Sequence, residues 1–268
     1  PFFCVATADA FIYADLARHL GPGRAVYGLH PQGLVSVHKP VIDIPWLAGK
    51  YIEQMRKVRP TGPYLVGGLC AAGAVAYEIA RQLAAAGEEV PLVALLDTPG
   101  PFSPFYRVLL WVRDLRRLVR HMATHARNLW HMSSSQRMDY LRKRTGRLKS
   151  KLHGEAVCPD RPRTDESVGR AYWMVFNGAY TRSMAKYRPE PYSGKVVLFL
   201  ASDEDSWRFS ASRRNWRRLT RGRVEEHIIP GTHSEILHEP KVAPLAESLL
   251  EHIRLAESDH APGKANIR

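Results

Sequence analysis

PYLVGGLCAAGAVAYEIARQL, residues 63–83, is the stretch of sequence that decides the fold. An apolar run leads into two glycines and a leucine, one cysteine follows, and an alanine-rich segment begins directly after it. The apolar run is typical of a buried strand and the alanine-rich segment of a helix, so strand and helix meet at Cys70. Small residues on both sides let the backbone approach itself closely there. We therefore predict a tight strand-to-helix turn that presents the Cys70 side chain.

This turn has the plan of the nucleophile elbow, usually Gly-x-Ser-x-Gly, in which a strained backbone exposes a reactive side chain. Residues 68–73 read GLCAAG, so Cys70 occupies the serine position and Ala72 that of the second glycine. A cysteine at a helix N-terminus has its thiolate favoured by the helix dipole. The alternative is a structural cysteine buried at a strand end, and these residues alone do not separate the two.

Apolar runs alternate with helical patterns over most of the 268-residue chain, which opens with a strand-like apolar run of its own. The other predicted strands are residues 24–30, 63–69, 91–97, 195–201 and 224–230. The predicted helices are residues 9–20, 45–58, 71–86 and 241–255. Strands that are apolar on both faces and alternate with helices predict an α/β fold with a doubly wound, mostly parallel sheet.

Between Pro99 and Pro191 this alternation stops, and helical patterns alone predict an all-helical insertion. Residues 107–151 hold 13 lysines and arginines but two acids, so they carry most of the net charge of +13. Apolar residues spaced three and four apart predict an amphipathic helix there. Four arginines fall outside its apolar face: Arg113, Arg116, Arg117 and Arg120. A solvated face, a docking surface for an acidic partner and a nucleic-acid-binding surface all fit, although no nucleic-acid motif accompanies the charges.

Two residues are candidate partners of Cys70. Asp97 ends the apolar run of "ALLDTPGP" (94–101), and His233 follows a predicted strand in "IIPGTHSEIL" (228–237). The order nucleophile, acid, histidine is that of α/β-hydrolases, and the carboxyl ends of parallel strands meet at one edge of the sheet. We predict a triad of Cys70, His233 and Asp97. Asp203 and Asp205, after a later strand, are the alternative acids.

With these residues in place, the chain resembles the type I thioesterase domains that end nonribosomal peptide synthetases and related polyketide synthases. Its similar blocks are residues 15–34, 59–83, 186–203 and 227–240. The resemblance implies an α/β-hydrolase fold in a single thioesterase domain over residues 1–268. It also implies that the insertion, residues 100–185, is a helical lid, and the polar residues 256–268 are expected to form a disordered tail. Serine is the usual nucleophile of this family, so the chain is a cysteine variant.

The implied activity is chain termination. A peptidyl or polyketide chain passes from the phosphopantetheine thioester of an upstream carrier domain onto Cys70, and leaves by cyclisation or hydrolysis. The domain binds no cofactor of its own, and Arg113, Arg116, Arg117 and Arg120 are candidates for docking the carrier. One oxyanion-hole N–H is expected from Ala71 and the other from Thr7 or, preferably, Ala8. The N-terminal loop "CVATADAF" (4–11) lacks the glycines that the family usually has there.

The remaining expectations concern location and alternatives. Three cysteines form no disulfide framework, no run of 18 apolar residues spans a membrane and no basic leader is visible. We therefore expect a cytoplasmic, monomeric domain with neither nucleic acid nor membrane as partner. A hydrolytic editing thioesterase and a small-ester esterase remain alternative enzymes. A basic nucleic-acid-binding module remains the alternative from another class.

Overall fold

The structure is a computed structural model that describes residues 1–31, 42–100, 111, 112, 115, 119, 176, 178–203, 206–221 and 223–259. The chain divides into two compact units. One comprises Pro1–Arg107 with Gly169–Arg268, and the other Val108–Val168. In the second unit the described residues 111, 112, 115 and 119 are helical. No helix of the described residues is both long and apolar enough to cross a membrane.

Within the described residues, six parallel strands form one sheet in the order β2-β1-β3-β4-β5-β6. Their bounds are β1 Phe2–Val5, β2 Val26–Leu29, β3 Leu65–Leu69, β4 Leu92–Leu96, β5 Val196–Ala201 and β6 Val224–Ile229. The central strands β1, β3, β4 and β5 are buried at every residue, which explains their unbroken apolar runs. The strand order reverses at β1, so a crevice for ligands is expected at the carboxyl ends of β1 and β3.

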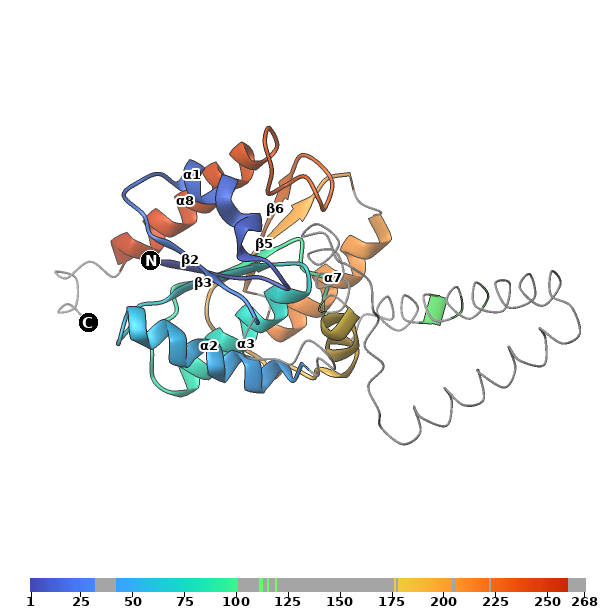
Figure 1. Cartoon of the computed structure of the whole chain (residues 1–268), viewed down its shortest axis with the longest axis horizontal. Coiled ribbons are helices and arrows are strands. Elements are labelled where there is room, and N and C mark those ends of the chain that lie inside the picture. The colour runs from blue at the N-terminus through green and yellow to red at the C-terminus, as the bar shows by residue number, and fades with distance from the viewer. Residues whose placement is uncertain are drawn as a thin grey trace, which may run out of the picture. The chain divides into compact units, whose positions relative to one another are not determined.

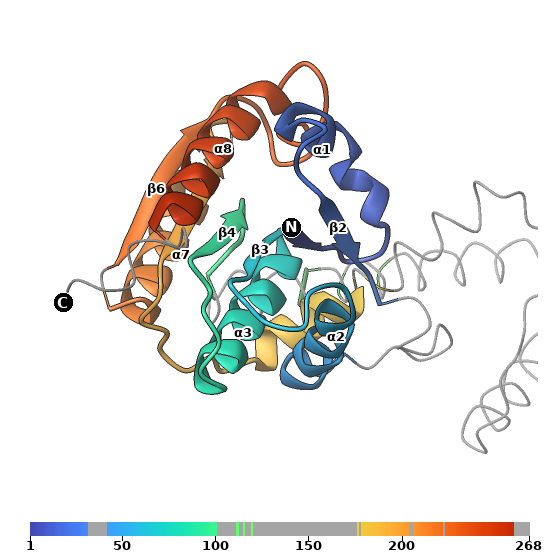
Figure 2. The same ribbon diagram turned by 90° about the vertical axis from the view of Figure 1, so that its left-hand side faces the viewer.

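Helices cover both faces of this sheet (Figures 1 and 2). One face carries α1 (Ala14–Leu20) and α8 (Val242–Asp259), and the other carries α2 (Ile44–Val58) and α3 (Ala71–Ala85). Strand β5 contributes side chains to the cores on both faces of the sheet, because its side chains alternate between the faces. Val197, Phe199 and Ala201 belong to the core under α1 and α8, and the other three residues to the core under α2 and α3. The predicted doubly wound α/β fold is confirmed.

The predicted strands and helices correspond to observed ones, with three differences. The helix predicted over residues 9–20 is a short 3-10 helix, η1 (Ala10–Tyr13), followed by α1. Helix α8 continues through Asp259, so residues 256–259 are helical and not part of a tail; residues 260–268 lie outside the described residues. Helix α7 (Ser206–Leu219) was not predicted, because its arginines hide the apolar pattern. Its Trp216 is fully buried in the core and donates its indole N–H to the carbonyl of Thr98 at 3.0 Å.

Most of the predicted lid, residues 100–185, lies outside the described residues, so the lid stays a prediction. Its end is described: residues 178–186 are helical. Phe176 and Tyr180 are fully buried in the core under α2 and α3.

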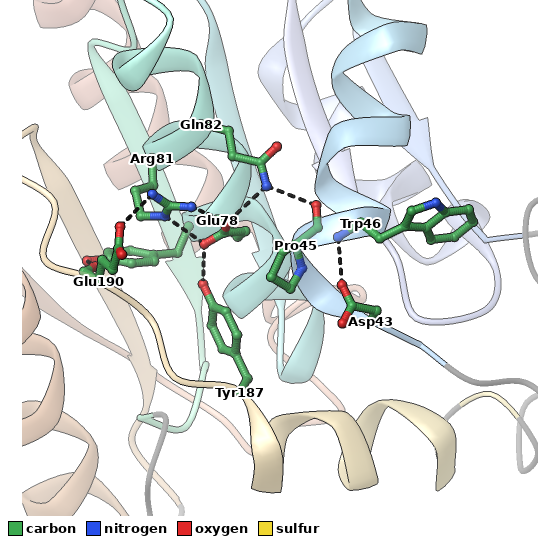
Figure 3. Close-up of polar contacts among 9 residues, drawn as sticks. Asp43, Pro45, Trp46, Glu78, Arg81, Gln82, Tyr187 and Glu190 are labelled. Atoms are coloured by element: carbon green, nitrogen blue, oxygen red, sulfur yellow. Dashed lines mark hydrogen bonds and ion pairs between the residues drawn. The ribbon is translucent and has the colours of Figure 1, made fainter.

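A buried carboxylate holds the segment that leads from this helix to β5 (Figure 3). Glu78 of α3 is 1% exposed and accepts hydrogen bonds from Arg81, Gln82 and the hydroxyl of Tyr187, the last at 2.6 Å. Burial alone would raise the pKa of Glu78, but these hydrogen bonds lower it below its usual range. Arg81 also pairs with Glu190 at 2.8 Å. The network therefore ties the helix that follows Cys70 to the segment of residues 187–190.

Candidate active site

Cys70 stands at the junction of β3 and α3, where the sequence predicted an elbow. Its backbone has φ 56° and ψ −131°, a left-handed conformation that residues other than glycine rarely adopt. The N–H of Cys70 donates to the carbonyl of Leu96 at 2.9 Å, and the N–H of Gly73 donates to the carbonyl of Cys70 at 3.1 Å. The tight strand-to-helix turn is confirmed, and neighbouring backbone holds it in place.

Two positions of the elbow require glycine, because neighbouring atoms lie too close to leave room for a Cβ. A Cβ added to Gly68 would lie 2.8 Å from the backbone carbon of Ala72, and one added to Gly73 would lie 2.0 Å from the hydroxyl of Thr98. Ala72, at the second-glycine position, is fully buried. An alanine is therefore accommodated at that position of this elbow, and the next residue, Gly73, is the one that approaches Thr98 closely.

The other described cysteine is in a different setting. Cys4 is fully buried in β1, and burial raises the pKa of its thiol far above the usual range. Cys70 is only partly buried. A thiol that is both buried and hard to ionise is inert, so Cys70 is the better nucleophile of the two. Cys158 lies outside the described residues.

Asp97 follows the carboxyl end of β4 and is 7% exposed. Its backbone is also left-handed, with φ 40°, and its N–H donates to the carbonyl of Phe199 at 2.6 Å. One carboxylate oxygen, Oδ1, accepts the N–H of Ala201 at 3.3 Å. The other, Oδ2, accepts a hydrogen bond from Nδ1 of His233. The end of β5 thus holds the carboxylate in the orientation that receives the imidazole.

His233 lies in the loop after β6 and contacts both Asp97 and Cys70. Burial alone would lower the pKa of His233, but hydrogen bonds to Asp97 and then to Cys70, with the charges of both, raise it to about 10. At such a pKa the imidazolium form of His233 is favoured at neutral pH, so these contacts stabilise a proton on the imidazole beside the Cys70 thiol. The structure thus brings together the three residues that the sequence singled out as a triad.

The alternative acids are not in this position. Asp203 lies in an exposed turn after β5, where its carboxylate accepts the hydroxyl of Ser202 at 2.5 Å. Asp205 lies outside the described residues. The ion pair that His233 makes is with Asp97, which favours Asp97 as the orienting acid.

The candidate oxyanion-hole residues lie on the same edge of the sheet. Ala71 is the first residue of α3, so its N–H belongs to the helix-terminal groups that lack an intrahelical partner. Ala8 lies in the loop after β1, and β1 pairs with β3 so that Val5 stands opposite Gly68. Both loops therefore begin next to each other, at the reversal of the strand order. Arg113, Arg116, Arg117 and Arg120 lie outside the described residues.

Sequence reasoning missed Tyr13, which connects these two loops. Its hydroxyl donates to the carbonyl of Val5 at 2.5 Å and accepts the N–H of Leu69 at 2.9 Å. Its ring is 2% exposed. One buried side chain thus joins the end of β1 to the residue before Cys70. Nothing in the sequence indicates this role, because Tyr13 fits the apolar pattern of the helix predicted over residues 9–20.

We expect Tyr13→Phe to slow acylation of Cys70 about tenfold, because it removes the hydrogen bonds that join the end of β1, and with it the Ala8 loop, to the elbow. The free energy of unfolding should fall by about 1–3 kcal/mol, since two buried backbone groups lose a hydrogen-bond partner. Alkylation of Cys70 by iodoacetamide needs no oxyanion hole, so its rate should stay the same. The exposed Tyr27 of β2 provides the control Tyr27→Phe. Equal losses in acylation and alkylation would show that Tyr13 only supports the fold.

Comparison with known proteins identifies the family. The family model for the thioesterase domain matches residues 2–255 of the chain. The chain belongs to the thioesterase domain family. This thioesterase domain is 25% identical to malpibaldin synthetase of Mortierella alpina over 243 residues, which are 88% of the domain and 4% of the synthetase. The domain thus spans a small part of that relative's length.

Solved structures agree with this assignment. Holo-AB3403, a four-domain nonribosomal peptide synthetase bound to AMP and glycine, matches the thioesterase domain with 29% identity and a TM-score of 0.63. The match covers 94% of the domain and 19% of that chain. The NocB thioesterase domain, in covalent complex with a fluorophosphonate nocardicin G analogue, has a TM-score of 0.59 at 24% identity and covers 94% of both chains. The second likeness shows the fold, which is the α/β-hydrolase fold that the sequence resemblance implied.

Proposed function

We propose that this thioesterase domain releases a peptidyl or polyketide chain from the phosphopantetheine thioester of a carrier domain, with Cys70 as the nucleophile. The observation that carries the proposal is the contact of His233 with both Cys70 and Asp97 at the carboxyl edge of the sheet. The relatives support the substrate class, because synthetases of this kind build their products on carrier domains. The domain needs no cofactor of its own in this reaction.

The proposed reaction has two halves. His233 accepts the thiol proton of Cys70, whose Sγ attacks the thioester carbonyl, and Asp97 stabilises the resulting imidazolium. The N–H groups of Ala71 and Ala8 receive the negative charge of the oxyanion. The C–S bond to pantetheine then breaks, and its thiol leaves with the proton from His233. In the second half His233 deprotonates water or a nucleophile of the acyl chain, which displaces Cys70 and frees the product.

Cysteine at position 70 favours cyclisation over hydrolysis in this proposal. A serine enzyme converts a thioester into an oxoester and loses part of the activation of the acyl group. Cys70 forms a thioester from a thioester, so the acyl group stays activated for the second step. Such activation helps attack by an amine or closure of a strained ring, where the internal nucleophile is weak or poorly placed.

Cys70→Ser tests this reason for the cysteine. Serine fits the elbow and His233 can serve it as base, so acyl loading should persist at a reduced rate. If the native release is a demanding cyclisation, the variant accumulates acyl-enzyme or releases hydrolysed product in place of the ring, as mass spectrometry would show. An unchanged cyclic product at an undiminished rate would show that thioester activation is not the reason.

The substrate class has its own test. Mass spectrometry of the protein incubated with acyl-pantetheine thioesters should show a mass increase on Cys70. The mass of the released product then shows whether it has gained water, as in hydrolysis, or has not, as in cyclisation. Wild-type protein should process carrier-bound thioesters far better than aryl esters of the same acyl group. A preference for the aryl esters would point to a small-ester esterase instead. A mass increase on Cys70 that occurs with short, non-native acyl groups alone would point to an editing thioesterase.

Docking of the carrier domain is assigned in this proposal to the basic segment, on its sequence alone. Charge reversal to glutamate at Arg113, Arg116, Arg117 and Arg120 should weaken processing of carrier-bound substrate about tenfold and spare free pantetheine thioesters. The loss should shrink as salt is raised, since exposed charges are screened within about 8–10 Å at physiological ionic strength. Equal losses on both substrates would place docking elsewhere, and RNA binding at that salt would favour the nucleic-acid alternative.

A further inference from the structure

A second cluster of chemically competent side chains lies between β6 and α8. Glu225 and His227 are two apart on β6, so both point to the face that α8 covers, and α8 contributes His252. The two imidazole Nε2 atoms are 2.8 Å apart. Oε1 of Glu225 is 3.4 Å from Nε2 of His227 and 3.5 Å from Nε2 of His252. Three potential ligand atoms thus face one another.

These distances match a metal ion in size. A circle through three atoms separated by 2.8, 3.4 and 3.5 Å has a radius of about 1.9 Å, close to the 2.0–2.2 Å that zinc keeps from nitrogen and oxygen ligands. A cation displaced slightly from the plane of the three atoms reaches the preferred distance to all of them. Binding therefore needs little movement of the protein.

Packing limits the rotation of the two imidazoles. The ring of His227 stacks on Phe199 of β5 with centroids 5.5 Å apart, and that of His252 meets the same phenylalanine edge-on at 6.1 Å. His252 is 2% exposed, and its Nδ1 has no hydrogen-bond partner among the described residues. The polar interactions of this buried ring that the structure describes are thus made through Nε2, the atom that faces the cluster.

The orientation and exposure of Glu225 and His227 also suit a cation. Lys195 lies 3.6 Å from the other carboxylate oxygen, Oε2, so Oε1 stays directed to the imidazoles. The side chains of Glu225 and His227 are 50% and 31% exposed, which leaves an entry path from solvent.

We propose that Glu225, His227 and His252 bind a divalent transition-metal ion of the zinc class, with water in the open coordination position. Two imidazoles and one carboxylate are a donor set that zinc accepts. The ion would cross-link the edge strand β6 to α8 and so stabilise the strand that leads to the loop of His233. Glu225 and His227 precede the carboxyl end of β6, so the site is separate from the triad and independent of the proposed reaction.

The test uses the full chain carrying Cys70→Ala, which removes the thiol of the triad as a competing ligand. Equilibrium dialysis against Zn²⁺ and titration with Co²⁺, whose visible absorption reports low coordination numbers, measure stoichiometry and affinity. Loss of one ligand should weaken binding at this site at least about 100-fold, more than loss of a supporting contact does. The variants are His227→Gln and Glu225→Gln, both at partly exposed positions, with His252→Gln as a third. His238→Gln, at an exposed histidine elsewhere, is the matched control.

The expected result is one equivalent of metal in the Cys70→Ala protein and in the His238→Gln control, lost in His227→Gln and in Glu225→Gln. Zn²⁺ should also raise the melting temperature of the first two proteins and leave that of the ligand variants unchanged. Equal stoichiometry and affinity in all these proteins, or no binding at all, would overturn the proposal and leave a hydrogen-bonded histidine pair. Circular dichroism shows whether His252→Gln folds. If it does not, His227→Gln and Glu225→Gln alone decide whether this site binds the metal.

Discussion

Replacing Cys70 with alanine should abolish acyl loading and product release together, by at least about 1,000-fold in kcat, as expected when a catalytic nucleophile is removed. Alanine is small enough for the elbow, and the thiol that it removes is only partly buried, so the protein should stay folded. Mass spectrometry for the acyl-enzyme, turnover of a pantetheine thioester and circular dichroism measure the three quantities.

Cys4→Ala is the matched control for this prediction. It removes the other described thiol from the core of β1, so it should cost stability, about 1 kcal/mol, and leave loading and turnover unchanged. Turnover that survives in Cys70→Ala would exclude Cys70 as the nucleophile.

Asp97→Asn should reduce kcat/KM at least about 100-fold, whereas Asp203→Asn should have little effect. Asparagine has the shape of aspartate and tolerates the left-handed backbone at this position, so the change removes the charge without distorting the loop. Without the carboxylate, the pKa of His233 should fall from about 10 toward its usual value, and an NMR titration of the imidazole would show it. The opposite ranking of the two variants would move the acid to the turn after β5.

Much of the fold follows from local pattern, because buried parallel strands and amphipathic helices leave clear traces. Helix α2, for example, was predicted as residues 45–58 and spans Ile44–Val58. Helix α7 left no such trace, because five of its 14 residues are arginines and its buried Trp216 stands among them. The strand order could not be derived from pattern either, since it depends on which crossover covers which face.

The sequence predicted Cys70, His233 and Asp97 as the triad, with Asp203 and Asp205 as alternative acids, but local pattern does not show which acid lies beside the histidine. Asp97 and Asp203 both follow buried strands, and only the placement of the β6 loop beside the end of β4 distinguishes them. The cluster of Glu225, His227 and His252 was missed for a related reason. Alternation on β6 puts Glu225 and His227 on one face, but His252 joins them through the packing of α8, which no local spacing reveals.

The strand order has a consequence for the order of folding during synthesis. Asp97 and His233 meet across a sequence separation of 136 residues, and Cys70 comes earlier still. A ribosome has therefore made Cys70 and Asp97 long before it makes His233, and contacts of such separation form late because they close large loops. Until β6 adds to the edge of the sheet, Cys70 lacks its contact with His233. A rate of Cys70 alkylation that depends on His233 would thus report completion of the native sheet in refolding experiments.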